Sequence, residues 1–339
     1  MTALRRVLLL NAYSANHAER LRGLLTTEWE VATALETEPT SRRDEELARA
    51  DALVHSRFSD AMPQGLKLAL IQTPTAGFDR IDPAALPKGC LVCNVHEHEV
   101  AIAEYVLAAM LQWVIGIADL DRRFRGGDWR GGVARLGHMH GELGGRTLGI
   151  IGHGRIGSEV ARRAKAFGMR VLGVTRRPRA APENVDRLAN LDGLDALLPQ
   201  CDVVLVACPL TPATRGMVDA RRLALMKRGA FLINVARAAI IDEEALFVAL
   251  KDGVIAGAAL DVWYAYPSPE EPEVRPSRFP FHTLDTVIMT PHASAWTHEL
   301  IERRWRFIAA NLDRFARGEA LLNVVIRDGR IVEGESAEG

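Results

Sequence analysis

The sequence predicts an α/β protein with two doubly wound parallel-sheet domains, one of them inserted in the other. Short apolar runs alternate with longer helical patterns along nearly the whole chain. Most of the runs are apolar throughout, which is typical of parallel strands that are covered on both faces. A glycine-rich turn lies in the middle of the chain. The domain that contains this turn therefore interrupts the other domain.

The bulk composition is that of an ordinary globular protein. The chain has 339 residues, of which 48% are hydrophobic and 25% charged, with a formal net charge of −1. This length allows two domains with cores of their own. The balanced charge gives no reason to expect nucleic acid or an anionic membrane as a partner. The first apolar run ends at Leu10 and is too short for a signal peptide, so we expect a cytoplasmic location.

The elements follow one another in the order that two such domains require. We expect strands at 5–10, 51–56, 67–72, 90–95, 146–152, 169–174, 202–208, 229–235, 255–262 and 285–290, and helices at 99–115, 158–168, 242–253 and 298–317. Residues 123–145 are rich in glycine and aperiodic, which indicates a surface loop. The expected domains are 1–100 with 294–330, and 101–293, followed by a flexible tail at 331–339.

The glycine-rich turn reads Gly152-His153-Gly154-Arg155-Ile156-Gly157 between an apolar strand and an amphipathic helix. In that setting the first glycine permits a tight turn, the second lets the backbone approach a pyrophosphate, and the third allows close packing of helix on strand. The N-terminus of the helix also attracts the anion. The turn predicts a Rossmann dinucleotide-binding domain, with Gly152, Gly154, Arg155, Ile156 and Gly157 at the cofactor.

The end of the next strand bears on which dinucleotide binds. Units that bind NAD usually place an acid there for the ribose hydroxyls. Here the strand ends in Thr175, followed by Arg176 and Arg177. No carboxylate repels a 2′-phosphate, and guanidinium groups can hold one in a bidentate manner. We therefore expect these three residues at the cofactor and NADP(H) in preference to NAD(H).

Four segments together resemble the D-isomer-specific 2-hydroxyacid dehydrogenase family. They are GIIGHGRIG, CDVVLVACPLTPATRGMVD, GAFLINVARAAIIDEEAL and AGAALDVW with the later VIMTPHASAW. The resemblance extends from about residue 71 to the C-terminal helix. It implies a flavodoxin-like substrate domain around the Rossmann domain, a cleft between the two, a small anionic substrate and a homodimer.

The resemblance also implies three residues for the chemistry. Arg237 matches the family's arginine, which holds the substrate carboxylate and polarises the carbonyl. His292 matches the proton donor and acceptor, whose ordinary pKa of about 6.5 suits both directions. The family usually has an acid beside that histidine, whereas this chain has Tyr266. A neutral phenol can orient an imidazole without stabilising the imidazolium, unless Glu270 or Glu271 takes the acid's place.

Further positions follow from the same resemblance. The substrate loop matches Thr75, Ala76 and Gly77, and Trp296 is a candidate wall of the substrate pocket, as are Trp263 and Tyr264 if they are not simply core residues. The remaining residues expected at the cofactor are Pro209, Thr214, Val235, Ala236 and Asp261, the last near the nicotinamide carboxamide.

Two other functions remain open at this point. Formate dehydrogenases of the wider superfamily carry a neutral side chain beside the histidine, so Tyr266 also fits the oxidation of a formate- or phosphite-like anion by hydride transfer alone. Ala76 does not match the lysine of phosphite enzymes, and the substrate loop does not resemble that of formate enzymes. A dinucleotide-sensing co-repressor on the same scaffold is the second alternative.

Two clusters of potential ligands are interpreted as structural. Cys90-x-x-Cys93 lies in an expected strand without a second pair, which favours buried reduced thiols over a redox site. His96-x-His98 has the spacing of two metal ligands, but no third ligand is evident in the sequence nearby and the family needs no metal. We therefore expect no metal site.

Overall fold

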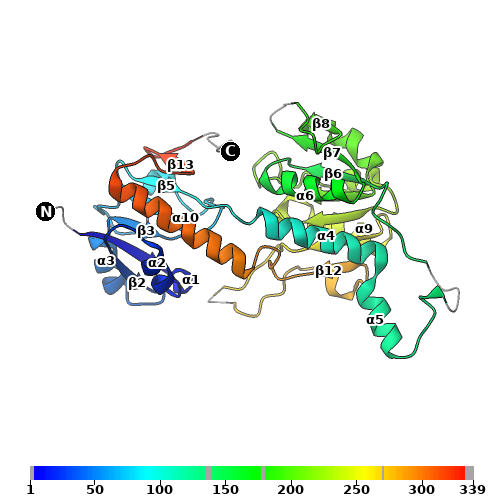
Figure 1. The fold of residues 1–339 in the computed structure, drawn as a ribbon, viewed down its shortest axis with the longest axis horizontal. Coiled ribbons are helices and arrows are strands. Elements are labelled where there is room, and N and C mark those ends of the chain that lie inside the picture. Colours follow the sequence, from blue (N-terminus) through cyan, green and yellow to red (C-terminus); the bar gives the residue numbers. More distant parts are fainter. Residues whose placement is uncertain (1–3, 134–138, 177–179, 269–270, 333–339) are drawn as a thin grey trace. The chain divides into compact units, whose positions relative to one another are not determined.

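The computed structural model describes residues 4–133, 139–176, 180–268 and 271–332. The chain forms two units, residues 1–97 with 297–339 and residues 98–296. Each unit contains a seven-stranded sheet, and the second unit is inserted in the first (Figure 1). The predicted fold class, a Rossmann domain inserted in a flavodoxin-like domain, is confirmed. The two breaks in the chain fall at 97/98 and 296/297, near the positions 100/101 and 293/294 expected from the sequence.

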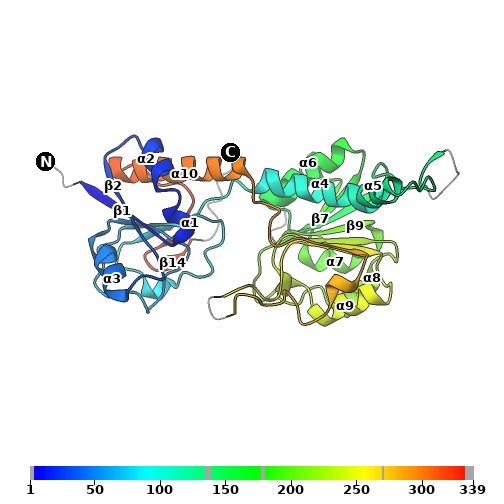
Figure 2. The ribbon, with the colours of Figure 1, turned by 90° about the horizontal axis from the view of Figure 1, so that it is seen from below.

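The sheet of the first unit has the strand order β14-β13-β5-β4-β3-β1-β2. Strands β1 to β5 pair in parallel, and β13 joins β5 in the antiparallel direction. Helices α2 and α10 cover one face and α3 covers the other (Figure 2). The elements are β1 (Arg5–Leu10), α1 (Ala12–Ala15), α2 (Ala18–Leu24), β2 (Trp29–Ala34), α3 (Thr40–Arg49), β3 (Ala52–Val54), β4 (Leu70–Gln72), η1 (Pro83–Ala85), β5 (Leu91–Cys93), α10 (His298–Arg317), β13 (Val324–Arg327) and β14 (Arg330–Ile331).

The C-terminal end of the first unit differs from the sequence-based prediction. Ile331 pairs with Ile326 in the β13–β14 hairpin, and the main-chain N–H of Val332 donates to Val325. Residues 331 and 332 therefore belong to the edge of the sheet and not to the tail expected from the sequence. Residues 333–339 lie outside the described part of the chain.

Helix α10 anchors the two ends of the first unit to each other. The side chain of Thr297 caps its first turn by accepting from the N–H of Leu300, and Gly318 ends it in the left-handed conformation with φ 71°. Between these ends, Trp305, Ile308 and Leu312 are fully buried against strands β1, β3 and β4. Burial of this apolar stripe holds the last part of the chain on a sheet built from the first part.

The sheet of the second unit is parallel throughout, in the order β12-β11-β10-β9-β6-β7-β8. Helices α4, α5 and α6 lie on one side and α7, α8 and α9 on the other (Figure 2). The elements are α4 (Glu99–Ile115), α5 (Ile117–Arg125), β6 (Thr147–Ile151), α6 (Arg155–Ala166), β7 (Arg170–Thr175), β8 (Arg187–Asn190), η3 (Leu191–Gly193), α7 (Leu194–Leu197), η4 (Leu198–Gln200), β9 (Val203–Val206), α8 (Ala220–Leu225), β10 (Phe231–Asn234), η5 (Ala238–Ile240), α9 (Glu243–Lys251), β11 (Gly257–Leu260), η6 (Phe281–Thr283) and β12 (Val287–Met289).

Strand position in the sheet explains why the sequence predicts β6 but not β2 or β8. It does not explain β12 (Val287–Met289), an apolar edge strand that is predicted, or β13 (Val324–Arg327), an inner strand that is not. The central strand β6 is buried at all five residues, as its apolar run indicates. The edge strands β2 and β8 are partly exposed and carry polar residues, so neither is among the predicted strands. An edge strand needs no apolar side chains on its open side, and its sequence signal is correspondingly weak.

Helices α4 and α5 are separated at Gly116, which has φ 71° and ends α4 in the left-handed conformation. No single helix among the described residues is long and apolar enough to cross a membrane. Helices α4 and α5 pass the test of length and hydropathy only when they are taken together, and a bend of 54° separates them. The apolar side chains of α4 are largely buried in a core formed with β6 and α6.

Candidate active site

The strand register brings three of the predicted residues to one edge of the second unit's sheet. Asn234 of β10 aligns with Leu260 of β11, and Leu260 aligns with Met289 of β12. The segments that follow these three strands therefore begin at the same height along the sheet. They carry Arg237, Asp261 and His292. The carboxyl edge of such a sheet is where doubly wound proteins bind their ligands.

The glycine turn lies at the same edge and is shaped by a lack of space. Gly152 has φ 101°, and a Cβ atom there would approach the backbone of Cys208 to 2.6 Å. A Cβ atom at Gly157 would lie 2.6 Å from the carbonyl oxygen of Gly152. At Gly154, by contrast, a Cβ atom would meet nothing within 4 Å. The turn is thus closed toward the protein and open where a pyrophosphate would approach the start of α6.

His292 lies in a loop that a buried carboxylate holds in place. The Asp261 side chain is fully buried and accepts three hydrogen bonds from this loop. They come from Thr290 Oγ1 at 2.6 Å, the N–H of Ala293 at 2.7 Å and the N–H of Ser294 at 2.9 Å. His292 itself has φ 58°, a conformation unfavourable for a non-glycine residue. The bonds to Asp261 compensate for this backbone strain.

Two aromatic side chains extend the network around Asp261. The hydroxyl of Tyr105, on α4, lies 2.8 Å from Thr290 Oγ1. The indole N–H of Trp263 donates to the main-chain oxygen of Thr290 at 2.8 Å. Because Thr290 Oγ1 donates to Asp261, Tyr105 is the donor to Thr290. Sequence reasoning missed Tyr105 and Thr290, since their role depends on packing between α4 and β12.

Tyr266 contacts the imidazole directly. Its hydroxyl oxygen lies 2.9 Å from His292 Nδ1 and accepts from the main-chain N–H of Trp263 at 3.1 Å. No carboxylate of the described residues bonds this ring nitrogen. The main chain of Glu271 pairs with Ser268, and Glu270 lies outside the described residues. The phenol of Tyr266 is therefore the described side chain that bonds this ring nitrogen.

The surroundings of His292 disfavour its charged form. Withdrawal of the imidazole from water lowers its pKa, and the positive charge of Arg237 lowers it further, while the negative charge of Asp261 acts in the opposite direction. The pKa of Tyr266 is raised, chiefly because its hydroxyl is partly buried. The pair is thus neutral near pH 7. Arg237 follows β10 and His292 follows β12, at the same edge of this sheet.

Residues 107–294 match the family model described as the D-isomer specific 2-hydroxyacid dehydrogenase, NAD binding domain. A glyoxylate reductase of Pyrococcus furiosus is 36% identical over 294 residues, which cover 83% of this chain and 84% of that protein. The chain belongs to the D-isomer specific 2-hydroxyacid dehydrogenase family. It is therefore a member of a family of oxidoreductases, and its second unit is the family's NAD-binding domain.

Two further relatives show how far the likeness extends. A D-3-phosphoglycerate dehydrogenase of Methanocaldococcus jannaschii is 37% identical over 305 residues, or 88% of this chain. The chain spans only 55% of that protein's length. A crystal structure of a D-isomer specific 2-hydroxyacid dehydrogenase from Xanthobacter autotrophicus, in complex with NADPH and MES, has a TM-score of 0.75 and 27% identity. It covers 96% of this chain and 98% of the other.

The turn that carries Arg237 is fixed by hydrogen bonds within the second unit. Arg237 follows β10, and its side chain is exposed, with Nη1 donating to the main-chain oxygen of Ala236 at 2.9 Å. Asn234 fixes the turn because its side chain donates to the carbonyl of Arg237 and accepts from the N–H of Ala236. The guanidinium is thus presented outward from a rigid turn, while Val235 and Ala236 are buried beneath it.

The other residues expected at the cofactor are placed as follows. Thr214 Oγ1 donates to the carbonyl of Pro209 at 2.8 Å and so closes the loop after β9. The guanidinium of Arg155 lies 3.9 Å from the carboxylate of Glu99 at the start of α4. Their contact with a cofactor stays a prediction, as it does for Asp261. Among the described residues, the hydrogen-bond donors to the Asp261 carboxylate all belong to the His292 loop.

The end of β7 is only partly described. Thr175 is the last residue of this strand, and the exposed Arg176 follows it. The prediction for Arg177 falls outside the described residues. No acid is present at the end of this strand, so the observation behind the NADP(H) prediction is unchanged.

The predicted substrate loop belongs to the first unit and follows β4. Three of its carbonyl groups accept hydrogen bonds within the loop region. Asn94 donates to the oxygen of Ala76 at 2.8 Å, and the hydroxyls of Thr73 and Thr75 donate to the oxygens of Thr75 and Gly77. Contact between Thr75, Ala76 or Gly77 and a substrate stays a prediction.

The aromatic residues that flank the active-site segments have different environments. Trp263 is buried and packs edge-on against Phe281, and the hydroxyl of Tyr264 donates to the carbonyl of Ile241. Trp263 is therefore a core residue of the second unit, whereas Tyr264 is half-buried. Trp296 is 65% exposed, so it remains a candidate for substrate contact.

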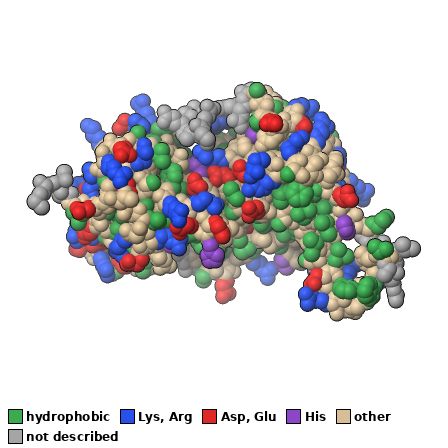
Figure 3. Space-filling model, in the orientation of Figure 1, with side chains coloured by type: hydrophobic (Ala, Val, Ile, Leu, Met, Phe, Trp, Pro, Cys, Tyr) green, Lys and Arg blue, Asp and Glu red, His purple; other side chains and the backbone are tan. Residues whose placement is uncertain are grey.

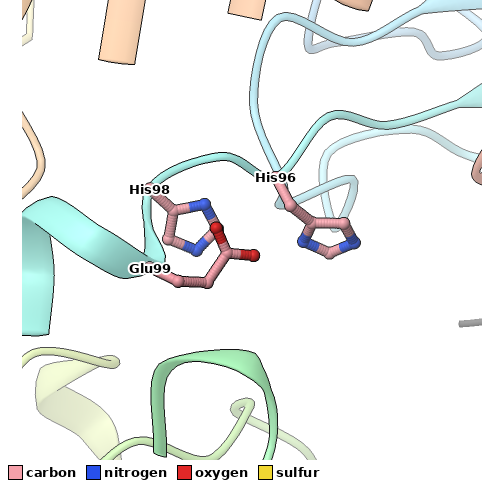
Figure 4. Close-up of side chains that lie close together, drawn as sticks. All are labelled: His96, His98 and Glu99. Carbon is pink, nitrogen blue, oxygen red and sulfur yellow. The ribbon is translucent and has the colours of Figure 1, made fainter. Parts of the chain in front are cut away.

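A potential metal-ligand set lies where the chain enters α4. Donor atoms of His96, His98 and Glu99 are all within 4.8 Å of one another (Figure 4). Glu97, with φ 70°, separates the two histidines, and its carbonyl accepts from Arg303. Sequence reasoning did not recognise the Glu99 carboxylate as a possible third metal ligand beside the two histidines. Two ligand atoms that each lie about 2.1 Å from one metal ion are roughly 3.4 Å apart, which is closer than the 4.8 Å within which these donor atoms lie. The guanidinium of Arg155 also lies near the Glu99 carboxylate. The absence of a metal therefore stays our prediction.

Proposed function

We propose that the protein reduces a 2-keto acid to the D-2-hydroxy acid with NADPH. The observation that carries this proposal is the pairing of His292 with Tyr266 at the sheet edge where the segment with Arg237 and the glycine turn also begin. One group binds and polarises an anionic carbonyl compound, and the other delivers a proton. Both requirements of keto-acid reduction thus lie in the same unit as the dinucleotide turn.

The residues of the turn fit a dinucleotide. The open space at Gly154 admits the pyrophosphate, and the twelve-residue helix α6 directs its N-terminus at it. When bound, the nicotinamide supplies a hydride to the carbonyl carbon. The guanidinium of Arg237 binds the carboxylate and draws electron density onto the carbonyl oxygen as its π bond opens. The imidazolium of His292 then gives one proton to that oxygen and becomes neutral, which balances the reduction.

The preference for NADPH is supported by the end of β7. A 2′-phosphate there would meet Thr175 and Arg176 and no carboxylate. The related Xanthobacter protein was crystallised in complex with NADPH. Changing Arg176 and Arg177 together to Ala should raise the KM for NADPH far more than that for NADH. Equal increases for the two cofactors would contradict the phosphate contact.

A turnover assay tests the proposed function. NADPH or NADH oxidation is followed with glyoxylate, hydroxypyruvate and larger 2-keto acids, and NADP⁺ or NAD⁺ reduction with formate and phosphite. The proposal predicts NADPH oxidation with at least one keto acid and its loss in His292→Ala. Dinucleotide binding without turnover of any compound would favour the sensing protein. Reduction of NADP⁺ by formate or phosphite alone would favour the oxidation of that anion.

The proposal includes a homodimer in the cytoplasm. Phe124 and Trp129 pack edge to face, with ring centroids 4.9 Å apart, and both are more than half exposed near α5. Hydrophobic side chains are visible at this part of the surface (Figure 3). Such a pair is typical of a surface that another chain covers. Sedimentation equilibrium should give twice the chain mass, and a monomer would contradict the proposal. The four free, buried cysteines suit a reducing compartment.

A further inference from the structure

The hydroxyl of Tyr266 connects the main chain to the imidazole of His292. It receives a hydrogen bond from the N–H of Trp263 at 3.1 Å and lies 2.9 Å from His292 Nδ1. A backbone N–H can only donate, so it occupies one lone pair of the phenol oxygen. The phenol proton is then directed away from Trp263. These two contacts also define the position of the oxygen on both sides.

The remaining question is which group donates between Tyr266 and His292. A phenol, with an ordinary pKa of about 10, is a far better donor than a neutral imidazole N–H, and an imidazole nitrogen is a better acceptor than a phenol oxygen. We infer that Tyr266, fixed by the Trp263 main chain, donates to Nδ1 and holds neutral His292 with its proton on Nε2. This inference rests on the proposed function for its catalytic meaning, although the tautomer itself does not depend on it.

The tautomer decides what the resting imidazole can do. With Nε2 protonated, the neutral ring can donate a hydrogen bond to a substrate oxygen but cannot remove a proton from a hydroxyl. To form the imidazolium, Nδ1 must gain a proton, and the new N–H group then donates a hydrogen bond to the phenol oxygen. The phenol O–H group must rotate away from Nδ1, toward solvent. Tyr266 is 46% exposed, which allows that rotation. A carboxylate in its place would accept from Nδ1 in both states.

The charged groups near the ring do not remove this effect. Asp261, at the end of β11, favours the imidazolium, while Arg237, after β10, opposes it. Both oxygens of Asp261 accept from the loop itself, from Thr290, Ala293 and Ser294. Tyr266 is therefore the side chain that contacts Nδ1 among the described residues, and it acts as a positioning residue for His292.

Nitrogen-15 NMR of histidine-labelled protein tests the inference without substrate. The His292 signals are assigned by their loss in His292→Gln. Above its pKa, wild-type His292 should show a protonated Nε2 and an unprotonated Nδ1. Tyr266→Glu should reverse this pattern, and Tyr266→Phe should give a mixture. The matched control is Tyr264→Phe, because the Tyr264 hydroxyl donates to Ile241 and should leave the His292 signals unchanged. A protonated Nδ1 in the neutral wild-type ring would overturn the inference.

The pH profile of reduction gives a second readout. Because reduction needs the imidazolium, kcat/KM falls as pH rises through the pKa of His292, which lies below its ordinary value. Tyr266→Glu should move this fall to higher pH by about one unit, since a carboxylate stabilises the imidazolium. An unmoved profile would overturn the role of Tyr266. If no keto acid is reduced but the NMR result holds, the proposed function fails and the tautomer inference stands.

Discussion

Asp261 in the second unit and Asp313 in the first unit each accept hydrogen bonds from the main chain and a threonine side chain of one loop, with different consequences. Asp261 accepts from two main-chain N–H groups and from the hydroxyl of Thr290. Asp313, on α10, accepts from the N–H groups and hydroxyls of Thr26 and Thr27. Both aspartates are buried. In each case the hydrogen bonds offset the free-energy cost of burying a charged carboxylate, and they fix the loop that donates them.

The likeness includes the threonines. The hydroxyl of Thr290 receives a bond from the hydroxyl of Tyr105 and passes one to Asp261. The hydroxyl of Thr27 receives a bond from the indole N–H of Trp29 and passes one to Asp313. What differs is the content of the loop. The loop held by Asp313 joins α2 to β2, whereas the loop held by Asp261 carries His292, so only the latter should affect activity.

Among changes to these two aspartates and their threonines, the largest effect on activity should follow from Asp261→Asn. An amide keeps the size of the side chain but loses the charge and turns an N–H₂ group toward main-chain donors. The strained conformation of His292 is then no longer held. We expect kcat/KM for keto-acid reduction to fall about 100-fold, the cost typical of a misplaced catalytic group. Steady-state kinetics checks this, and activity within about twofold of wild type would show that the loop holds His292 without Asp261.

The matched change in the first unit is Asp313→Asn. It should lower the free energy of unfolding by about 2–4 kcal/mol, because several bonds to a buried carboxylate are weakened. Equilibrium unfolding in urea measures this loss, and kcat/KM should remain within about twofold of wild type. Burial alone would raise the pKa of Asp313, but the bonds from Thr26 and Thr27 lower it below its usual range. A large loss of activity in the folded variant would break the comparison.

The smallest effects should come from the two threonines. Thr290→Val removes one bond to Asp261 and one to Tyr105 while keeping the side-chain shape. We expect about a tenfold loss of kcat/KM, since the two N–H groups still hold the loop. Thr27→Val removes the equivalent bonds at Asp313 and should leave kcat/KM unchanged. Equal activity of the two variants in a side-by-side assay would refute the distinction between the loops.

Local sequence patterns predict the glycine turn and the central strands because those features depend on neighbouring residues. The turn needs glycine where φ is positive at Gly152 and where helix and strand meet at Gly157. The central strands are buried on both faces and are apolar throughout. The edge strands β2 and β8 are partly exposed and need not be apolar throughout, so their polar residues gave no strand signal in the sequence.

The contacts that hold the active site were beyond prediction for a different reason. The resemblance to the family identifies Arg237, His292 and Tyr266 as positions. It does not show that Asp261 binds the His292 loop, or that Trp263 fixes Tyr266 through its main chain. Thr26 and Asp313 are 287 residues apart in the sequence. Such bonds depend on the packed fold, and no local periodicity encodes them.

The central claim is that Arg237 and His292 act on the same carbonyl group, and a double-mutant cycle tests it most directly. kcat/KM for reduction is measured in wild type, Arg237→Gln, His292→Gln and the double variant. Each single change should cost about 10²–10⁴-fold, and the double variant should lose far less than the product of the two. Losses that simply multiply, or near wild-type activity in either single variant, would contradict the account.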